Sequence, residues 1–234
     1  MPKAACQKSN VEQRAAATPV SRTFQATAQP TLEEAGKRGL DVSIAALALF
    51  LLFPLLLLLC LAIWAHDGRA PIFRHRRIGR GGQTFDCLKF RSMVVDGEAV
   101  LQEHLARDRT ARAEWEATHK LTNDPRITPL GRLLRKTSLD ELPQLVNVLK
   151  GEMSLVGPRP IVQAELARYG AAFDACFSVT PGVTGLWQVS GRSDCSYAER
   201  VALDLDYAAH WRLSRDLAIL LRTVPAVLAQ RGSR

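Results

Sequence analysis

The longest pattern in the chain is an apolar run at residues 44–65, IAALALFLLFPLLLLLCLAIWA, which contains no charged side chain. An α-helix rises about 1.5 Å per residue, so this run is roughly 33 Å long, enough to cross a bilayer core of about 30 Å. The other interpretation is a helix buried inside a soluble protein. The length and the leucine content of the run favour a membrane segment.

Pro54 interrupts the apolar run near its middle. Proline removes a backbone donor and kinks a helix, so each half covers about half of the bilayer core. Basic residues flank both ends, which favours the cytoplasmic side for both; they are Lys37, Arg38, Arg69, Arg74, Arg76, Arg77 and Arg80. Two topologies fit these features: a segment that bends at Pro54 and leaves by the same face, and a kinked span.

The remaining residues, 70–234, show the patterns of a small mixed domain. Apolar and polar residues alternate over 76–93 around Gly81-Gly82, a pair typical of a hairpin turn. Helices are expected at 94–120, with Trp115 and Leu121 packing inward, at 130–137, at 141–151 with Gly151 at its end, at 196–213 and at 214–229. The segment 153–162 reads as irregular, and 177–193 as loop and short strand. The sequence predicts a membrane-associated, α-rich α+β fold with a β-hairpin and interfacial amphipathic helices.

Three parts follow from these patterns. Residues 1–35 are rich in Ala, Thr, Gln and Pro without an apolar period, so we expect a disordered tail. Residues 36–69 form the membrane segment, and residues 70–234 form the working domain. The apolar run begins too late for a convincing signal peptide, and no small-residue cleavage site follows it.

Charge and cysteine content narrow the class of partner. Lys and Arg number 31 against 23 Asp and Glu, and the net charge of +8 favours anionic partners. Aromatic residues are only 6% of the chain, which argues against a stacking platform for single-stranded nucleic acid. The cysteines are irregularly spaced and form no CxxC pair, so we expect reduced thiols rather than disulfides or a metal site; they are Cys6, Cys60, Cys87, Cys176 and Cys195.

Two adjacent carboxylates, Asp140 and Glu141, stand out in the motif TSLDELP. One interpretation is helix punctuation, since Ser138 followed by Glu141 fits a capping box and Pro143 is tolerated near a helix start. The other is a site for a diphosphate and Mg²⁺, which one or two carboxylates usually hold together with substrate phosphates. Cations recur nearby in short Gly- and Pro-containing loops suited to phosphate, namely Lys89, Arg91, Arg126, Arg132, Arg135, Lys136, Arg159 and Arg192.

Long motifs carry a family resemblance. These are KRGLDVSIA at 37–45, LKFRSM at 88–93, DPRITPLGRLLRKTSLDELPQLVNVLKGEMSLVGPRP at 124–160 and PGVTGLWQVSGRS at 181–193. Together they resemble the bacterial sugar transferases, the monotopic phosphoglycosyl transferases that act on undecaprenyl phosphate, from about residue 37 to the C-terminus. The segments HRRIGRGGQTFDCLKF and TVPAVLAQRGSR resemble the small exopolysaccharide branch that transfers galactose 1-phosphate.

The resemblance implies a reaction. Asp140 is expected to attack the β-phosphate of a UDP-hexose and release UMP, and undecaprenyl phosphate then takes the hexose 1-phosphate from Asp140. Glu141, with Asp140, is expected to hold Mg²⁺. Lys89, Arg135 and Arg159 match family positions near the phosphates, and we add Arg91 and Arg192 as phosphate-binding candidates. Galactose is favoured by the branch resemblance and glucose comes next.

The resemblance also bears on the membrane segment. The family's segment re-enters and leaves by the same face, which places the domain on the cytoplasmic face of the inner membrane. The break is Phe53-Pro54 here and Ser-Pro in several relatives, so a hydroxyl that could satisfy freed carbonyls is missing. Lys37, Arg38 and Asp41 match the family's motif at the start of this segment. We expect Lys37 and Arg38 to bind lipid headgroups and Asp41 to cap or pair.

The expected partners are therefore a UDP-hexose, undecaprenyl phosphate, the lipid bilayer and downstream glycosyltransferases, with no nucleic acid. Two rivals stay open: a non-catalytic, membrane-anchored basic module that binds anionic lipid or nucleic acid, and an enzyme in which the lipid phosphate attacks the UDP-sugar directly. We give no catalytic role to the histidines. Asp124 is expected to be a turn residue, and Trp187 and Trp211 core or interface anchors. Asp204 and Asp206 are expected to offset nearby arginines.

Overall fold

The computed structural model describes residues 31–118, 121–190 and 196–228. In chain order its helices and strands are α1 (Leu32–Asp67), β1 (Ile72–Ile78), β2 (Thr84–Phe90), α2 (Gly97–Arg107), α3 (Arg109–Thr118), α4 (Pro129–Thr137), α5 (Gln144–Lys150), β3 (Ser154–Val156), α6 (Leu166–Tyr169), α7 (Phe173–Cys176), β4 (Gly182–Thr184), α8 (Leu186–Ser190), α9 (Tyr197–Ala209) and α10 (Leu213–Leu228). Short 3₁₀ turns lie at Arg80–Gly82, Leu139–Glu141, Gln163–Glu165 and Gly170–Ala172. This confirms an α-rich α+β fold.

Helix α1 begins earlier than the sequence patterns indicated. The Thr31 hydroxyl accepts the Glu34 N–H at 3.2 Å, and the Glu34 carboxylate accepts the Thr31 N–H at 2.9 Å, which makes a capping box. The predicted end of the tail at residue 35 is therefore wrong, because this cap starts the helix at Leu32. Residues 1–30, where disorder was expected, lie outside the described residues.

The predicted hairpin is confirmed. Strands β1 and β2 pair antiparallel from Ile72 opposite Phe90 to Ile78 opposite Thr84. Gly81 and Gly82 in the turn have φ of 62° and 78°, a region that glycine adopts without strain. The segments 153–162 and 177–193 supply β3 and β4, which pair parallel through Ser154–Gly182 and Val156–Thr184. Helix α8, in the second of these segments, was not predicted.

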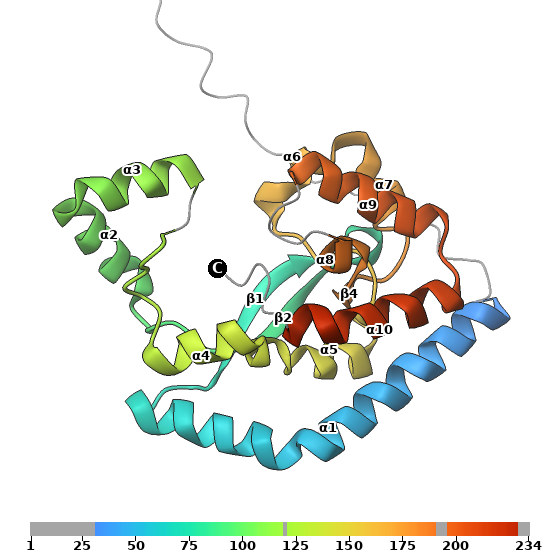
Figure 1. Ribbon diagram of the computed structural model, residues 1–234, viewed down its shortest axis with the longest axis horizontal. Helices are drawn as coiled ribbons and strands as arrows, with labels where there is room; N and C mark the ends of the chain where they lie inside the picture. The colour runs from blue at the N-terminus through green and yellow to red at the C-terminus, as the bar shows by residue number, and fades with distance from the viewer. Residues whose placement is uncertain (1–30, 119–120, 191–195, 229–234) are drawn as a thin grey trace, which may run out of the picture.

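The two halves of α1 pack against different parts of one domain (Figure 1). In the first half, Ala45 joins the core that holds Val148 of α5 and Val156 of β3. In the second half, Leu59 and Ile63 join a cluster with Phe90 and Leu134, from β2 and α4. Helix α1 therefore runs along the domain and does not leave it at either end.

Polar contacts hold both ends of α1 to the domain. Near the N-terminus, Lys37 Nζ lies 2.5 Å from the buried Asp216 carboxylate of α10 and donates to the Val156 carbonyl at 3.1 Å. At the C-terminus, the Arg91 guanidinium pairs with Asp67 through two hydrogen bonds, one of them 2.6 Å long. Both ends of the apolar helix are thus fixed on the same body.

These contacts bear on the roles expected of Lys37 and Arg38. The Arg38 guanidinium donates to the carbonyls of Val148 and Leu149, at 2.6 and 2.9 Å, in the last turn of α5, whose end carbonyls lack helical partners. The structure gives both cations partners within the protein, and the headgroup contacts expected for them stay a prediction. Asp41 Oδ2 lies 3.9 Å from Lys37 Nζ, in agreement with the pairing expected within their motif, and Asp41 Oδ1 also accepts the Leu155 N–H at 3.1 Å.

Pro54 bends α1 but does not end it. The helix continues through Pro54, and Figure 1 shows it bent about its middle. The expected helix-break-helix is therefore a single bent helix, because a bend relieves the clash of the proline ring with the preceding turn. Phe53, beside the bend, is 61% exposed.

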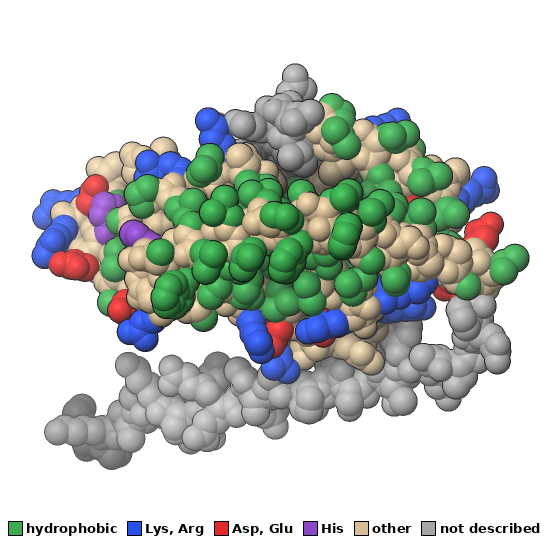
Figure 2. Space-filling model, turned by 90° about the horizontal axis from the view of Figure 1, so that it is seen from below, with side chains coloured by type: hydrophobic (Ala, Val, Ile, Leu, Met, Phe, Trp, Pro, Cys, Tyr) green, Lys and Arg blue, Asp and Glu red, His purple; other side chains and the backbone are tan. Residues whose placement is uncertain are grey.

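An exposed apolar face runs along α1. Figure 2 shows apolar side chains covering the view from below, with basic side chains along part of its border. The large members on α1 are Leu47, Phe50, Leu51, Phe53, Leu57, Leu58, Leu61 and Trp64. Exposed apolar side chains also lie on α4, α5 and α10, namely Leu133, Leu149, Leu217, Leu221 and Val224. By length and composition α1 is the one described helix that could cross a membrane.

Other sequence expectations have mixed outcomes. The helix expected at 94–120 is two helices, because the Asp108 side chain accepts backbone N–H groups of Thr110 and Ala111 and starts α3 anew. Trp115 and Leu121 pack on this pair as predicted. Gly151 ends α5 with φ of 84°, as predicted. The last two helices are separated at residues 210–212, a little before the predicted boundary.

The roles expected for several polar side chains and thiols are largely confirmed. Asp124 is a turn residue that accepts the Arg126 N–H at 3.0 Å. Trp211 packs on the core and donates to Asp216 at 3.0 Å, and Asp206 pairs with Arg215. Cys60, Cys87 and Cys176 are free thiols, whereas Cys6 and Cys195 lie outside the described residues.

We predict that Lys37→Ala destabilises the fold by about 3–5 kcal/mol, because it leaves the buried Asp216 carboxylate without its ion partner. Thermal unfolding of the purified protein measures this. The double variant Lys37→Met with Asp216→Asn removes both charges and should recover most of the loss. Equal losses in the single and the double variant would contradict the ion-pair account.

Asp204 gives a pH dependence of stability. It is 1% exposed and accepts the Tyr169 hydroxyl at 2.7 Å, and burial raises its pKa from 3.8 to about 6. A carboxyl with a higher pKa in the folded than in the unfolded chain contributes stability below the unfolded pKa, and this is lost as pH rises through the folded pKa. Two pKa units correspond to about 3 kcal/mol. The free energy of unfolding of wild type should therefore fall between about pH 4 and about pH 6, and Asp204→Asn should remove this fall. Unfolding curves of the variant that show the same fall as wild type would contradict the assignment.

Candidate active site

The carboxylate pair lies on a tight turn between α4 and α5. Ser138, at the end of α4, has φ of 57°, the positive-φ position among the described non-glycine residues, and Leu139–Glu141 form a 3₁₀ turn. The Ser138 side chain makes no capping hydrogen bond, so the capping-box interpretation of TSLDELP is wrong. The left-handed residue ends α4 and turns the chain, and a strained backbone of this kind is often found at functional sites.

Glu141 forms an ion pair with Lys89 of β2. Lys89 Nζ lies 2.6 Å from Glu141 Oε1, and the two side chains are 20% and 30% exposed. Burial acts to raise the pKa of Glu141, but the charges of Lys89, Arg159 and Arg77 overcome it and lower the pKa. Glu141 is therefore ionised, and its carboxylate is available to a metal ion as well as to Lys89.

Asp140 is more enclosed, with only 9% of its surface exposed. Burial, together with the neighbouring Glu141 charge, raises its pKa to about 6, while Lys89 and Arg135 oppose this shift. A carboxylate with a raised pKa is more basic than usual and still ionised at neutral pH. Such a group is suited to nucleophilic or acid–base chemistry.

Asn147 of α5 fixes the strand that carries Lys89. This fully buried side chain accepts the Leu88 N–H at 3.0 Å and donates to the Asp86 carbonyl at 2.8 Å. Because α5 follows the carboxylate turn directly, these bonds fix the position of β2 relative to the turn. This arrangement brings Lys89 of β2 next to Glu141 of the turn.

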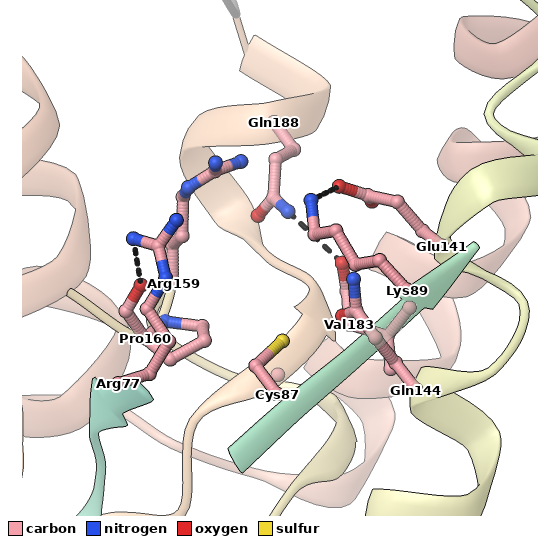
Figure 3. A pocket seen from close by; sticks show the side chains of 10 residues that line it. Arg77, Cys87, Lys89, Glu141, Gln144, Arg159, Pro160, Val183 and Gln188 are labelled. Carbon is pink, nitrogen blue, oxygen red and sulfur yellow. Dashed lines mark hydrogen bonds and ion pairs between the residues drawn. The ribbon is translucent and has the colours of Figure 1, made fainter. Parts of the chain in front are cut away.

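A pocket opens between this pair and a second group of cations (Figure 3). Figure 3 places Lys89 and Glu141 on one side and Arg77 and Arg159 on the other, with Gln188 between them at the rim. Its lining is Arg77, Cys87, Lys89, Glu141, Gln144, Arg159, Pro160, Gly182, Val183 and Gln188. Two predicted phosphate ligands, Lys89 and Arg159, are thus brought to one pocket beside Glu141.

Arg135 influences Asp140 but is not among the residues that line the pocket. Its Nε donates to the Ser92 hydroxyl at 2.8 Å, and its charge is among those that lower the pKa of Asp140. Burial lowers the pKa of Arg135 itself, while Asp140 opposes that shift. Arg135 therefore lies close enough to Asp140 to influence its charge.

Arg91 does not reach this pocket. Its guanidinium is taken up by Asp67 and its Nε donates to the Ala70 carbonyl at 3.0 Å. The structure therefore does not bring Arg91 to this pocket with Lys89 and Arg159, because Arg91 holds the end of α1, and its phosphate role stays a prediction. Arg192, the other added candidate, lies outside the described residues.

Comparison with known proteins agrees with the motifs that build this pocket. The family model described as Bacterial sugar transferase matches residues 32–230. The chain belongs to the bacterial sugar transferase family. That span includes α1, the carboxylate turn and every residue of the pocket lining.

Three relatives of this sugar transferase give finer context. The exopolysaccharide production protein ExoY of Sinorhizobium fredii is 53% identical over 197 residues, which cover 84% of this chain and 87% of that protein. The UDP-galactose-lipid carrier transferase of Erwinia amylovora is 54% identical and the undecaprenyl-phosphate galactose phosphotransferase of Salmonella typhimurium is 52% identical, each over 84% of this chain. The chain spans 41% of each of these two longer proteins.

Several pocket residues of this sugar transferase were missed by the sequence reasoning. Arg77 was counted only among the charges flanking the apolar run, and its position beside Ile78 in a strand gave no sign of the pocket. Gln144 and Gln188 lie inside the motifs DELPQ and GLWQVSGR, which carried the signal without separating these glutamines from their neighbours.

Trp187, predicted to be a packing anchor, fills that role. Two guanidinium groups approach its ring, with Arg159 at 5.9 Å and Arg200 at 5.1 Å from the centroid. Such cation–π contacts stabilise an arginine without neutralising it. Trp187 therefore supports Arg159 at the edge of the pocket.

The donor set at the turn fits a magnesium ion that arrives with phosphate. Among the described residues no group of three or more His, Cys, Asp and Glu side chains is gathered for a metal. Asp140 and Glu141 alone supply two adjacent hard oxygen donors. Magnesium is usually held by one or two carboxylates plus substrate phosphates, so this pair is sufficient when a diphosphate completes the coordination.

Proposed function

We propose that this sugar transferase moves hexose 1-phosphate from a UDP-hexose to undecaprenyl phosphate, as the first membrane step of exopolysaccharide synthesis, with Asp140 as the nucleophile. Galactose is the favoured hexose, because the relatives named for a sugar above are named for galactose. The observation that carries the proposal is the enclosed Asp140, with its raised pKa, next in the chain to Glu141, whose ion pair with Lys89 lines a pocket that two arginines also line. Asp140 itself is not among the residues that line this pocket.

The first half of the reaction uses Asp140. One carboxylate oxygen attacks the β-phosphorus of the UDP-hexose, and the bond from that phosphorus to the bridging oxygen breaks. UMP leaves with the electron pair, and the hexose phosphate remains on Asp140 as an acyl phosphate. Lys89, Arg135 and Arg159 stabilise the charge that develops on the phosphoryl oxygens.

The second half restores the enzyme. A phosphate oxygen of undecaprenyl phosphate attacks the same phosphorus, the Asp140–phosphorus bond breaks, and the lipid diphosphosugar leaves. Asp140 returns to its carboxylate form. Asp140 and Glu141 would hold Mg²⁺, which would supply charge neutralisation and a template for the diphosphate.

The membrane arrangement follows from the packing of α1. We infer that the apolar face along α1 enters one leaflet of the inner membrane, since exposed apolar area of this extent marks an interaction surface. Both ends of α1 are bound to the domain, so both belong on one side, the cytoplasmic face, where UDP-sugars are available. The polyprenyl acceptor then reaches the pocket from the bilayer, and downstream glycosyltransferases receive the product.

We predict that Asp140→Asn abolishes UMP release, by on the order of 10³-fold or more, since it removes the nucleophile. The assay is UMP production by the solubilised protein with Mg²⁺, undecaprenyl phosphate and a panel of UDP-sugars. Asp96→Asn, an exposed carboxylate without a side-chain capping bond, is the matched control and should keep wild-type rates.

A wild-type protein that turns over none of the UDP-sugars would contradict the proposal. The non-catalytic basic module would then be the better account. In that case Asp140→Asn should leave binding to anionic vesicles unchanged or strengthen it, because a carboxylate beside cations weakens anion binding.

A further inference from the structure

Two arginines on one wall of the pocket lack a neutralising carboxylate in the pocket itself. Lys89 is paired with Glu141, but Arg159 forms no ion pair with a described carboxylate and is held by the Trp187 ring. Arg77 has only a distant carboxylate, with Nη1 3.7 Å from Glu165, which Arg200 also approaches at 3.5 Å. The positive charge on this wall of the pocket is therefore only partly neutralised by the protein.

The Arg77 guanidinium is held in place with donor capacity to spare. Its Nη2 lies 3.2 Å from His75 Nδ1 and its Nη1 donates to the Pro160 carbonyl at 3.4 Å. Burial, with the charges of Arg77, Lys89 and Arg159, lowers the pKa of His75 to about 4, so the imidazole is neutral and its Nδ1 accepts. The Arg77 Nε is buried and has no hydrogen-bond partner.

Burial also lowers the pKa of Arg77, and the charge of Arg159 adds to this effect. Two guanidinium groups close enough to influence each other, inside a partly buried wall, are stabilised by an anion that bridges them. Arginine forks bind phosphate oxygens in pairs, which makes a phosphate group the natural bridging anion.

A diphosphate has two phosphates to place, and the pocket has two cationic walls. One wall carries Lys89 and Glu141, the residue after Asp140 in the chain, and is assigned to the phosphate that Asp140 attacks. The opposite wall carries Arg77 and Arg159 (Figure 3). We propose, resting on the function proposed above, that Arg77 with Arg159 binds the nucleoside-side phosphate of the nucleoside diphosphate sugar, and so the phosphate of the departing nucleoside monophosphate.

This assignment gives Arg77 a role in leaving-group departure. When the bond between the β-phosphorus and the bridging oxygen breaks, the electron pair goes to the phosphate of the nucleoside monophosphate. A second negative charge develops there, and the Arg77 guanidinium lies on the wall that receives it. His75, Pro160 and Glu165 position Arg77, whereas Arg77 itself contacts the leaving group.

The test is UMP binding by the full chain in the Asp140→Asn background, which is unable to turn over. Calorimetric titration with UMP should show binding weakened about tenfold or more in Arg77→Gln, since charge-assisted hydrogen bonds are lost. Arg76→Gln is the matched control, because Arg76 is the adjacent, exposed arginine of β1, points to the other side of the strand and binds Thr84 at 3.1 Å. It should bind UMP as the parent does.

Arg77→Lys tests the same claim without removing the charge, and should retain part of the lost affinity. If Arg77→Gln fails to fold, Arg77→Lys decides: UMP binding weaker than in the Arg76→Gln control supports the inference, and equal binding overturns it. Parental UMP affinity in a folded Arg77→Gln also overturns it. If wild type releases UMP from a UDP-sugar, parental UMP affinity in Arg77→Gln removes the Arg77 assignment and leaves the proposed function in place. If the Asp140→Asn protein binds no UMP and wild type turns over no UDP-sugar, the proposed function fails as well.

Discussion

The structure depends on one constraint: both ends of a long apolar helix are tied to the same small domain. The Lys37–Asp216 pair fixes the start of α1 and the Arg91–Asp67 pair fixes its end. A helix held in this way cannot extend away from the domain, so its apolar side chains lie along one face. The bend at Pro54 lets the helix follow that face and continue past the one backbone hydrogen bond that the proline cannot donate.

Strand β2 joins this constraint to the chemistry. The last two residues of β2 and the residue that follows it serve three purposes: Lys89 pairs with Glu141 at the pocket, Phe90 packs in the cluster beneath α1, and Arg91, just past the strand, holds Asp67. Alternation along a strand sends neighbouring side chains to opposite faces, so a short motif can bind a helix and line a pocket together. The pocket is therefore set at a fixed position relative to the apolar face of α1.

Much of the fold follows from local signals in the sequence. The glycine pair of the hairpin, Gly151 after α5 and the apolar run of α1 each predict their element, because backbone conformation and burial are local demands there. The site was predicted in part, since Asp140, Glu141 and Lys89 stand in long motifs. Contacts with a distant partner were not predicted: Arg91 and Lys37 are cations in basic stretches, and only the folded chain shows the carboxylates that bind them.

The account rests on Asp140 as a covalent nucleophile rather than on direct attack by the lipid phosphate. The most direct measurement is the mass of the peptide that contains Asp140, after the protein meets UDP-galactose and Mg²⁺ without a lipid acceptor. The account predicts an adduct of one hexose phosphate on this peptide, lost when undecaprenyl phosphate is added. An active protein that shows no adduct, and releases no UMP until the acceptor is present, would contradict it.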